Sequence, residues 1–78
     1  MTFYITKNKR GATHQFSKPP KYAKAHDAWV AVGQMPLYLS DNKDTFPEVT
    51  FENSPFEYTI DFTNATITIK EWHSPENK

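Results

Sequence analysis

The sequence predicts an α+β domain in which one helix packs on one face of an antiparallel sheet of about four to five strands. Apolar and polar residues alternate in residues 2–7 and 12–17, and again in residues 56–72, which favours two β-hairpins. Between the hairpins, residues 17–36 carry the start and stop signals of a helix. The expected order of elements is ββαβββ(β), in a single domain that covers residues 1–78.

The first hairpin is expected to join residues 2–7 and 12–17 through a turn that ends at Gly11. A loop centred on residues 9 and 10 brings apolar side chains together on one face and polar ones on the other, as a half-buried antiparallel pair requires. In this register the pairs are Phe3–Phe16 and Ile5–His14 on the apolar face, and Tyr4–Gln15 and Thr6–Thr13 on the polar face.

Residues 17–36 have the features of a helix with defined ends. Ser17 is a candidate N-cap, prolines occupy the first turn, and Gly33 and Pro36 follow the end. Four residues recur at helical spacing and form one apolar stripe: Tyr22, Ala25, Trp29 and Val32. The alternative is a strand over residues 29–32, because a tryptophan and two valines favour a sheet.

Two short strands are expected to follow the helix, over residues 37–40 and 48–53, with a polar loop between them. An Asn-Ser-Pro turn over residues 53–55 ends the second of these strands. At the end of the chain, residues 73–78 are polar and are expected to fray.

The clearest local pattern is the alternation of residues 56–72 on both sides of a turn at Thr63 and Asn64. The register centred on this turn gives an apolar face and places opposite charges across from each other on the other face. Its pairs are Phe62–Ala65, Ile60–Ile67 and Tyr58–Ile69 on the apolar face, and Asp61–Thr66, Thr59–Thr68 and Glu57–Lys70 on the polar face.

The net charge of zero conceals a strong asymmetry between the two halves of the chain. Residues 1–39 have a net charge of +5 and residues 40–78 a net charge of −5. Such asymmetry indicates a charged interaction surface. The candidate basic surface consists of Lys7, Lys9, Arg10, Lys18, Lys21 and Lys24. The candidate acidic surface consists of Glu48, Glu52, Glu57 and Asp61.

No combination of residues indicates catalysis, a metal or a cofactor. The chain has no cysteine, and its histidines (His14, His26 and His73) lack the i, i+4 spacing of two metal ligands on a helix. Glu57 and Asp61 would lie about 13 Å apart along a strand, too far for a pair of glycosidase carboxylates. We therefore expect no enzyme activity, no metal and no cofactor.

The sequence also lacks the signals of secretion and membrane insertion. It does not begin with a basic segment followed by an apolar run, and its longest apolar run, residues 28–32, is far shorter than the roughly 20 residues of a membrane span. We therefore expect a cytoplasmic protein that does not enter a membrane.

The missing chemistry, the many aromatic residues and the split charge lead us to expect a non-enzymatic protein-binding module that acts through its polarised surface. It would serve as an inhibitor, adaptor or accessory subunit of a larger complex. Compact chains of this length without cysteines or motifs are also typical of accessory genes of phages and other mobile elements. The alternative is a nucleic-acid-binding module that uses the basic hairpin tip and the start of the helix. A third hypothesis is a homodimer, because complementary poles on one domain favour pairing.

Overall fold

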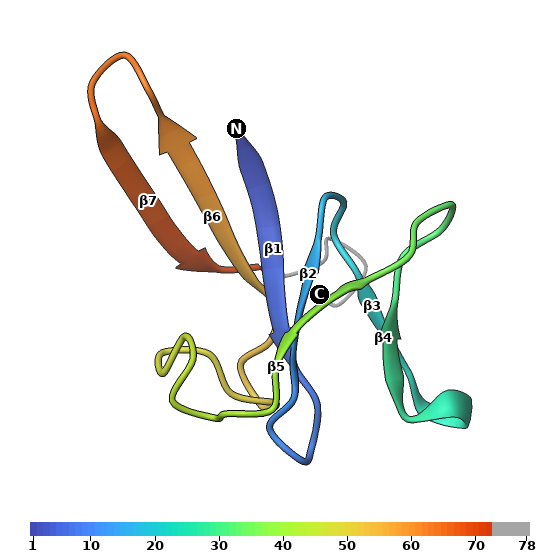
Figure 1. Ribbon diagram of the computed structural model, residues 1–78. Coiled ribbons are helices and arrows are strands. Elements are labelled where there is room, and N and C mark those ends of the chain that lie inside the picture. Colours follow the sequence, from blue (N-terminus) through green and yellow to red (C-terminus); the bar gives the residue numbers. More distant parts are fainter. Residues whose placement is uncertain (73–78) are drawn as a thin grey trace.

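Residues 1–72, the part of the chain that the computed structural model describes, form seven strands, one 3-10 turn and no α-helix (Figure 1). Five strands form one antiparallel sheet in the order β5-β2-β1-β6-β7, and β3 pairs with β4 in a separate hairpin. The strands are β1 (Thr2–Lys7), β2 (Thr13–Phe16), β3 (Lys21–Ala23), β4 (Ala28–Val30), β5 (Leu37–Ser40), β6 (Phe56–Asp61) and β7 (Thr66–Glu71). The tail predicted to fray, residues 73–78, lies outside the described residues.

The predicted α+β class is wrong, because no helix forms over residues 17–36. In its place β3 and β4 run antiparallel to each other. They are joined by a single 3-10 turn, Lys24–His26, which ends at Asp27 in the left-handed conformation (φ 49°). Aspartate is one of the few residues other than glycine that adopts this conformation readily, so the turn can end there and reverse the chain.

The apolar stripe that predicted the helix has a different origin. Tyr22 and Trp29 lie directly opposite each other across the β3–β4 hairpin, with ring centroids 5.4 Å apart. A spacing of seven residues is about two helical turns, but it is equally the spacing of a cross-strand pair in a short hairpin. The alternative of a strand over residues 29–32 is closer to the structure, although β4 begins one residue earlier and ends at Val30.

The hairpin of β1 and β2 is confirmed, but its register differs from the prediction by one residue. Phe16 lies opposite Tyr4 instead of Phe3. The connection has an odd number of residues, and the Asn8 side chain accepts hydrogen bonds from the backbone N–H groups two and four residues further on. Gly11 completes the turn with a φ of 91°. Because side chains alternate along a strand, this shift of one residue moves Phe16 to the other face of the sheet.

The hairpin of β6 and β7 has the register that the sequence predicted. Ile60 lies opposite Ile67, and on the other face Glu57 forms an ion pair with Lys70 at 3.5 Å. Asp61 stabilises the turn, since its carboxylate accepts hydrogen bonds from the backbone N–H groups of the two central turn residues.

The segment between β5 and β6 contains a further correction. The strand predicted over residues 37–40 is confirmed as β5, but the strand predicted over 48–53 is wrong, because this segment forms turns. The Asn53 side chain accepts a hydrogen bond from the Thr50 N–H and donates one to the Glu48 carbonyl. Hydrogen bonds of this kind, from a short polar side chain to nearby backbone groups, take the place of the hydrogen bonds that a strand would form with a neighbouring strand.

The hydrophobic core lies between one face of the central strands and the loop that joins β5 to β6. Ile5 of β1, Tyr58 of β6 and Val49 of the loop are its buried members. The Tyr58 ring stacks on Phe3 with centroids 5.3 Å apart and meets the edge of Phe46 at 5.4 Å. No helix in residues 1–72 is long and apolar enough to cross a lipid bilayer.

We predict that Ile5→Ala will lower the free energy of unfolding by about 2–5 kcal/mol, because it removes a fully buried side chain from this core. Chemical denaturation followed by circular dichroism measures this loss. The control is Val32→Ala, at a side chain that is 95% exposed, which should change the value by less than about 0.5 kcal/mol. Equal losses in the two variants would show that the core lies elsewhere.

Candidate functional site

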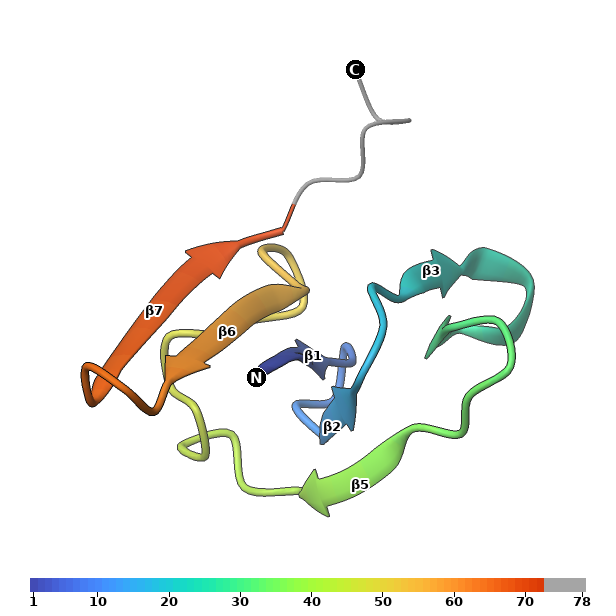
Figure 2. The ribbon, with the colours of Figure 1, turned by 90° about the horizontal axis from the view of Figure 1, so that it is seen from above.

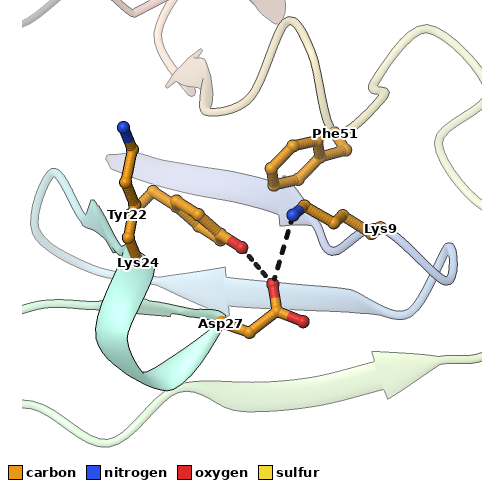
Figure 3. A pocket seen from close by; sticks show the side chains of 5 residues that line it. All are labelled: Lys9, Tyr22, Lys24, Asp27 and Phe51. Atoms are coloured by element: carbon orange, nitrogen blue, oxygen red, sulfur yellow. Dashed lines mark hydrogen bonds and ion pairs between the residues drawn. The ribbon is translucent and has the colours of Figure 1, made fainter.

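A pocket of about 490 Å³ lies where the β1–β2 turn, the β3–β4 hairpin and the loop between β5 and β6 meet (Figure 3). Its volume is within the range of roughly 300–1,000 Å³ that is typical of ligand sites. The lining residues are Lys9, Tyr22, Lys24, Asp27 and Phe51. The pocket thus combines two aromatic rings with two ammonium groups and one carboxylate.

The two rings that line the pocket pack against each other and against a third ring, Trp29. Tyr22 meets Phe51 edge to face with centroids 5.0 Å apart, and Trp29 lies 6.2 Å from Phe51. The Trp29 indole N–H also donates a hydrogen bond of 3.0 Å to the Lys7 carbonyl at the end of β1. This bond joins the separate hairpin to the main sheet, and the edge-to-face contacts join the hairpin to the loop.

In Figure 3 the Lys9 side chain extends between Phe51 and Asp27, with its ammonium directed toward the Asp27 carboxylate. Its ammonium lies 5.5 Å from the Phe51 ring centroid and 5.9 Å from that of Tyr22, within the range of a cation–π interaction. The same ammonium is 4.0 Å from an Asp27 carboxylate oxygen, which also accepts a hydrogen bond from the Tyr22 hydroxyl. That hydrogen bond raises the pKa of Tyr22 above its ordinary value.

The six predicted basic residues do not form one continuous surface. Lys9 and Lys24 meet at the pocket, whereas Lys18 and Lys21 line a second hollow of about 340 Å³ beside β4. Arg10 is exposed on the β1–β2 turn. The sixth residue, Lys7, is only 4% exposed, and its ammonium donates hydrogen bonds to two backbone carbonyls of the loop.

The predicted acidic residues are also separated by the fold. Glu57 and Tyr58 are consecutive in β6, so their side chains point to opposite faces of the sheet. Glu48 accepts a hydrogen bond from the Tyr58 hydroxyl on one face, whereas Glu57 accepts one from the Tyr4 hydroxyl on the other. Asp61 is engaged in its own turn, and Glu52 is exposed in the loop. These four residues therefore do not line a single ridge.

These contacts change the acidity of the groups involved. The hydrogen bond from Tyr58 lowers the pKa of Glu48 below its ordinary value. Burial, followed by the hydrogen bond to Glu48, strongly raises the pKa of Tyr58. The hydrogen bond from the Asn64 side chain is the main reason that the pKa of Asp61 is lowered. The carboxylates of Glu48 and Asp61 thus remain ionised at neutral pH.

Exposed apolar side chains form two further groups that the charge pattern did not reveal. The first, which we call the 30–38 segment, runs from β4 into β5 and includes Val30, Val32, Met35, Leu37 and Tyr38. The second lies at the end of the sheet and includes Met1, Phe62, Ile67 and Ile69. A Gln34 side chain that accepts hydrogen bonds from the Ser17 and Lys18 N–H groups fixes the first group beside the end of β2.

No pattern in the sequence indicates two of the residues that line the pocket. Phe51 lies far from Lys9 along the chain and was assigned to a strand, and Asp27 was assigned to a helix. Among residues 1–72 no cluster of three or more acidic or histidine side chains could hold a metal ion. Comparison with protein-family models, with curated proteins and with solved structures finds no match to this chain.

We predict that Glu48→Gln will reduce the acid sensitivity of folding. Because the pKa of Glu48 is lower in the folded protein than its ordinary value of 4.5, its ionised form stabilises the fold above that pH. This stabilisation is lost as the pH falls through the folded pKa. The variant should therefore be less stable than the wild type at neutral pH, and the difference should shrink below about pH 4.

Urea denaturation over this pH range measures the effect. Tyr58→Phe removes the hydroxyl that donates to Glu48, so this variant should lose the same part of the pH dependence, and the double variant should lose no more. If the free energy of unfolding of Glu48→Gln depends on pH in the same way as that of the wild type, this account is contradicted.

Proposed function

We propose that this protein is a non-enzymatic protein-binding module that acts as an inhibitor, adaptor or accessory subunit of a larger complex. The observation that supports the proposal most directly is the 30–38 segment, in which Val32 is 95% and Met35 is 87% exposed. Large apolar side chains exposed together on a small domain are typical of an interaction surface. A partner that covers them would gain from the removal of apolar surface from water.

Positive charge beside the 30–38 segment favours a partner with acidic groups. Lys18 and Lys21 line a hollow together with Val30 and Val32, so apolar and basic groups share this part of the surface. A complementary partner would present apolar side chains with carboxylates around them. Opposite charges at the rim would raise the association rate and set the orientation, while burial of the apolar side chains would provide most of the affinity.

The proposed surface therefore lies in the basic half of the chain and not in the acidic one. Glu48, Glu57 and Asp61 are each engaged by neighbouring groups of the same chain, which makes them less suited to bind a partner. Small secreted domains commonly depend on disulfides, and this chain has no cysteine, so the proposal places the complex in the cytoplasm.

The double variant Val32→Asp/Met35→Asp should lose the partner and keep its fold, because both side chains are exposed. Immobilised wild type and variant are compared by quantitative mass spectrometry of the proteins that each retains from a lysate of the native cells. The matched control is Phe62→Asp/Ile67→Asp, which places the same two negative charges at exposed apolar residues of the β6–β7 hairpin. The proposal fails if the wild type enriches no protein, or if the variant retains the same proteins.

A second candidate function is the binding of single-stranded nucleic acid, and the pocket in Figure 3 favours it specifically. Two lysines beside two half-buried aromatic rings are the combination that such proteins use, with ammonium groups for phosphates and ring faces for bases. The basic β1–β2 turn would contribute Arg10 next to the pocket. The strand hairpin, and not a helix, would carry Lys24.

For this second function, we predict that a fluorescent single-stranded oligonucleotide binds with an affinity that falls as the salt concentration rises. Each phosphate contact contributes about 0.7 to the logarithmic slope, so Lys9→Gln and Lys24→Gln should each reduce the slope by about that amount. Phe51→Ala should weaken binding by about 1–3 kcal/mol through lost stacking. Lys43→Gln, at an exposed lysine outside the pocket lining, is the control. Absence of binding at low salt would exclude this function.

A further inference from the structure

The two edges of the main sheet differ in how well they are protected against pairing with another strand. The β5 edge has four residues, follows a proline, and pairs irregularly with β2 at a bulge. The β7 edge has six residues and pairs with β6 without interruption. Short length, bulges, prolines and charged side chains such as lysine keep natural sheet edges from associating. The lysine of β7, Lys70, is paired with Glu57 of its own chain. Along residues 1–72, β7 is therefore the edge that is most open to a further strand (Figure 2).

The backbone groups that face outward from β7 follow from its hydrogen bonds to β6. The Trp72 N–H donates to the Pro55 carbonyl at 2.8 Å, and in an antiparallel pair every second residue forms such bonds. Lys70 and Thr68 therefore face β6 with their backbone groups. The N–H and C=O groups of Ile67 and Ile69 face away from β6, toward the open edge.

The apolar face of the sheet also continues to this edge without cover. Ile67 and Ile69 lie opposite Ile60 and Tyr58 in the register of the hairpin. Tyr58 is buried beneath the loop between β5 and β6, but Ile67 is 62% and Ile69 is 48% exposed. The apolar rows that begin in the core thus end at β7 with their last side chains in water.

We propose that β7 pairs with β7 of a second copy of this chain, antiparallel, about a two-fold axis that passes beside Thr68. In this arrangement Ile67 lies opposite Ile69 of the second copy, and the reverse pair forms on the other side of the axis. Both members of each pair direct their backbone groups outward, so the two copies gain about four backbone hydrogen bonds. The two sheets join into one continuous sheet.

The side chains favour this register over its neighbours. On the apolar face, Ile60 and Ile67 of one copy continue into Ile69 and Tyr58 of the other, and both rows remain unbroken. A shift of two residues would place Ile67 opposite Glu71 in one direction or Ile69 opposite Ala65 of the turn in the other. A shift of one residue would place apolar side chains opposite polar ones.

The charges on the other face agree with the same register. Lys70 already pairs with Glu57 of its own chain. Across the proposed interface it lies opposite Thr66 of the second copy, whose neighbour on β6 is Asp61. Each Lys70 would therefore have Glu57 of its own chain on the neighbouring strand and Asp61 of the second copy two strands away, about 10 Å across the sheet. The 30–38 segment lies toward the other edge of the sheet and remains uncovered, so this dimer is independent of the proposed function.

The absence of cysteine from the sequence allows a sharp test by single cysteines. Thr68 would lie opposite itself in a pair without hydrogen bonds, with Cα atoms about 4.5 Å apart, a distance that permits a disulfide. Thr68→Cys should therefore form a disulfide-linked dimer under mild oxidation. Thr66→Cys is the matched control, because the two copies of this residue would lie about 13 Å apart, and it should stay monomeric.

Sedimentation of the protein without cysteine provides the second measurement. The wild type should shift from monomer to dimer as its concentration rises, while Ile67→Lys should stay monomeric and keep the circular dichroism of the wild type. A wild type that remains monomeric would overturn the proposal. So would a dimer in which Thr68→Cys does not cross-link, or one in which Thr66→Cys cross-links equally well.

Discussion

The residue on which most of the structure depends is Lys7, at the end of the central strand. Its N–H donates to the Ser54 hydroxyl at 2.9 Å, its carbonyl accepts the indole N–H of Trp29, and its ammonium donates to the carbonyls of Lys43 and Phe46. A buried ammonium is costly unless it is hydrogen-bonded, and these two acceptors offset that cost. Through this one residue β1 holds both the loop that carries Phe51 and the hairpin that carries Tyr22, so the pocket between them depends on a lysine that does not line it.

Lys7 also shows why charge counted along a sequence is a poor guide to charge on a surface. The neighbours of an ionised group depend on the fold. Here Lys7 is buried, and Glu48 and Glu57 lie on opposite faces of the sheet. The two halves of the chain do differ in net charge. In the acidic half, however, Glu48, Glu57 and Asp61 each bind groups of their own chain. The exposed apolar side chains are more informative, because nothing in the described part of the chain covers them.

The sequence predicted those elements whose evidence is contained in a short stretch. The β6–β7 hairpin, with its register, could be predicted because the alternation and the turn around Asp61 agree. The β1–β2 register could not, because it depends on how the Asn8 side chain bridges an odd-numbered connection. The helix was predicted wrongly because Tyr22 and Trp29 satisfy helical and cross-strand spacing equally. Of the pocket, only its two lysines were predicted as parts of a binding surface, since Phe51 joins them through tertiary contacts alone.

The position of Lys9 has a consequence for any ligand of the pocket. The Lys9 ammonium lies over the rings of Phe51 and Tyr22 and beside Asp27, so this side chain already occupies the ring faces. A ligand that stacks there competes with this side chain, and its apparent affinity equals the intrinsic affinity reduced by the fraction of molecules in which Lys9 has swung away. A ligand with a phosphate could instead recruit the displaced ammonium as its counter-charge. The same lysine would then act as a competitor in the free protein and as a contact in the complex.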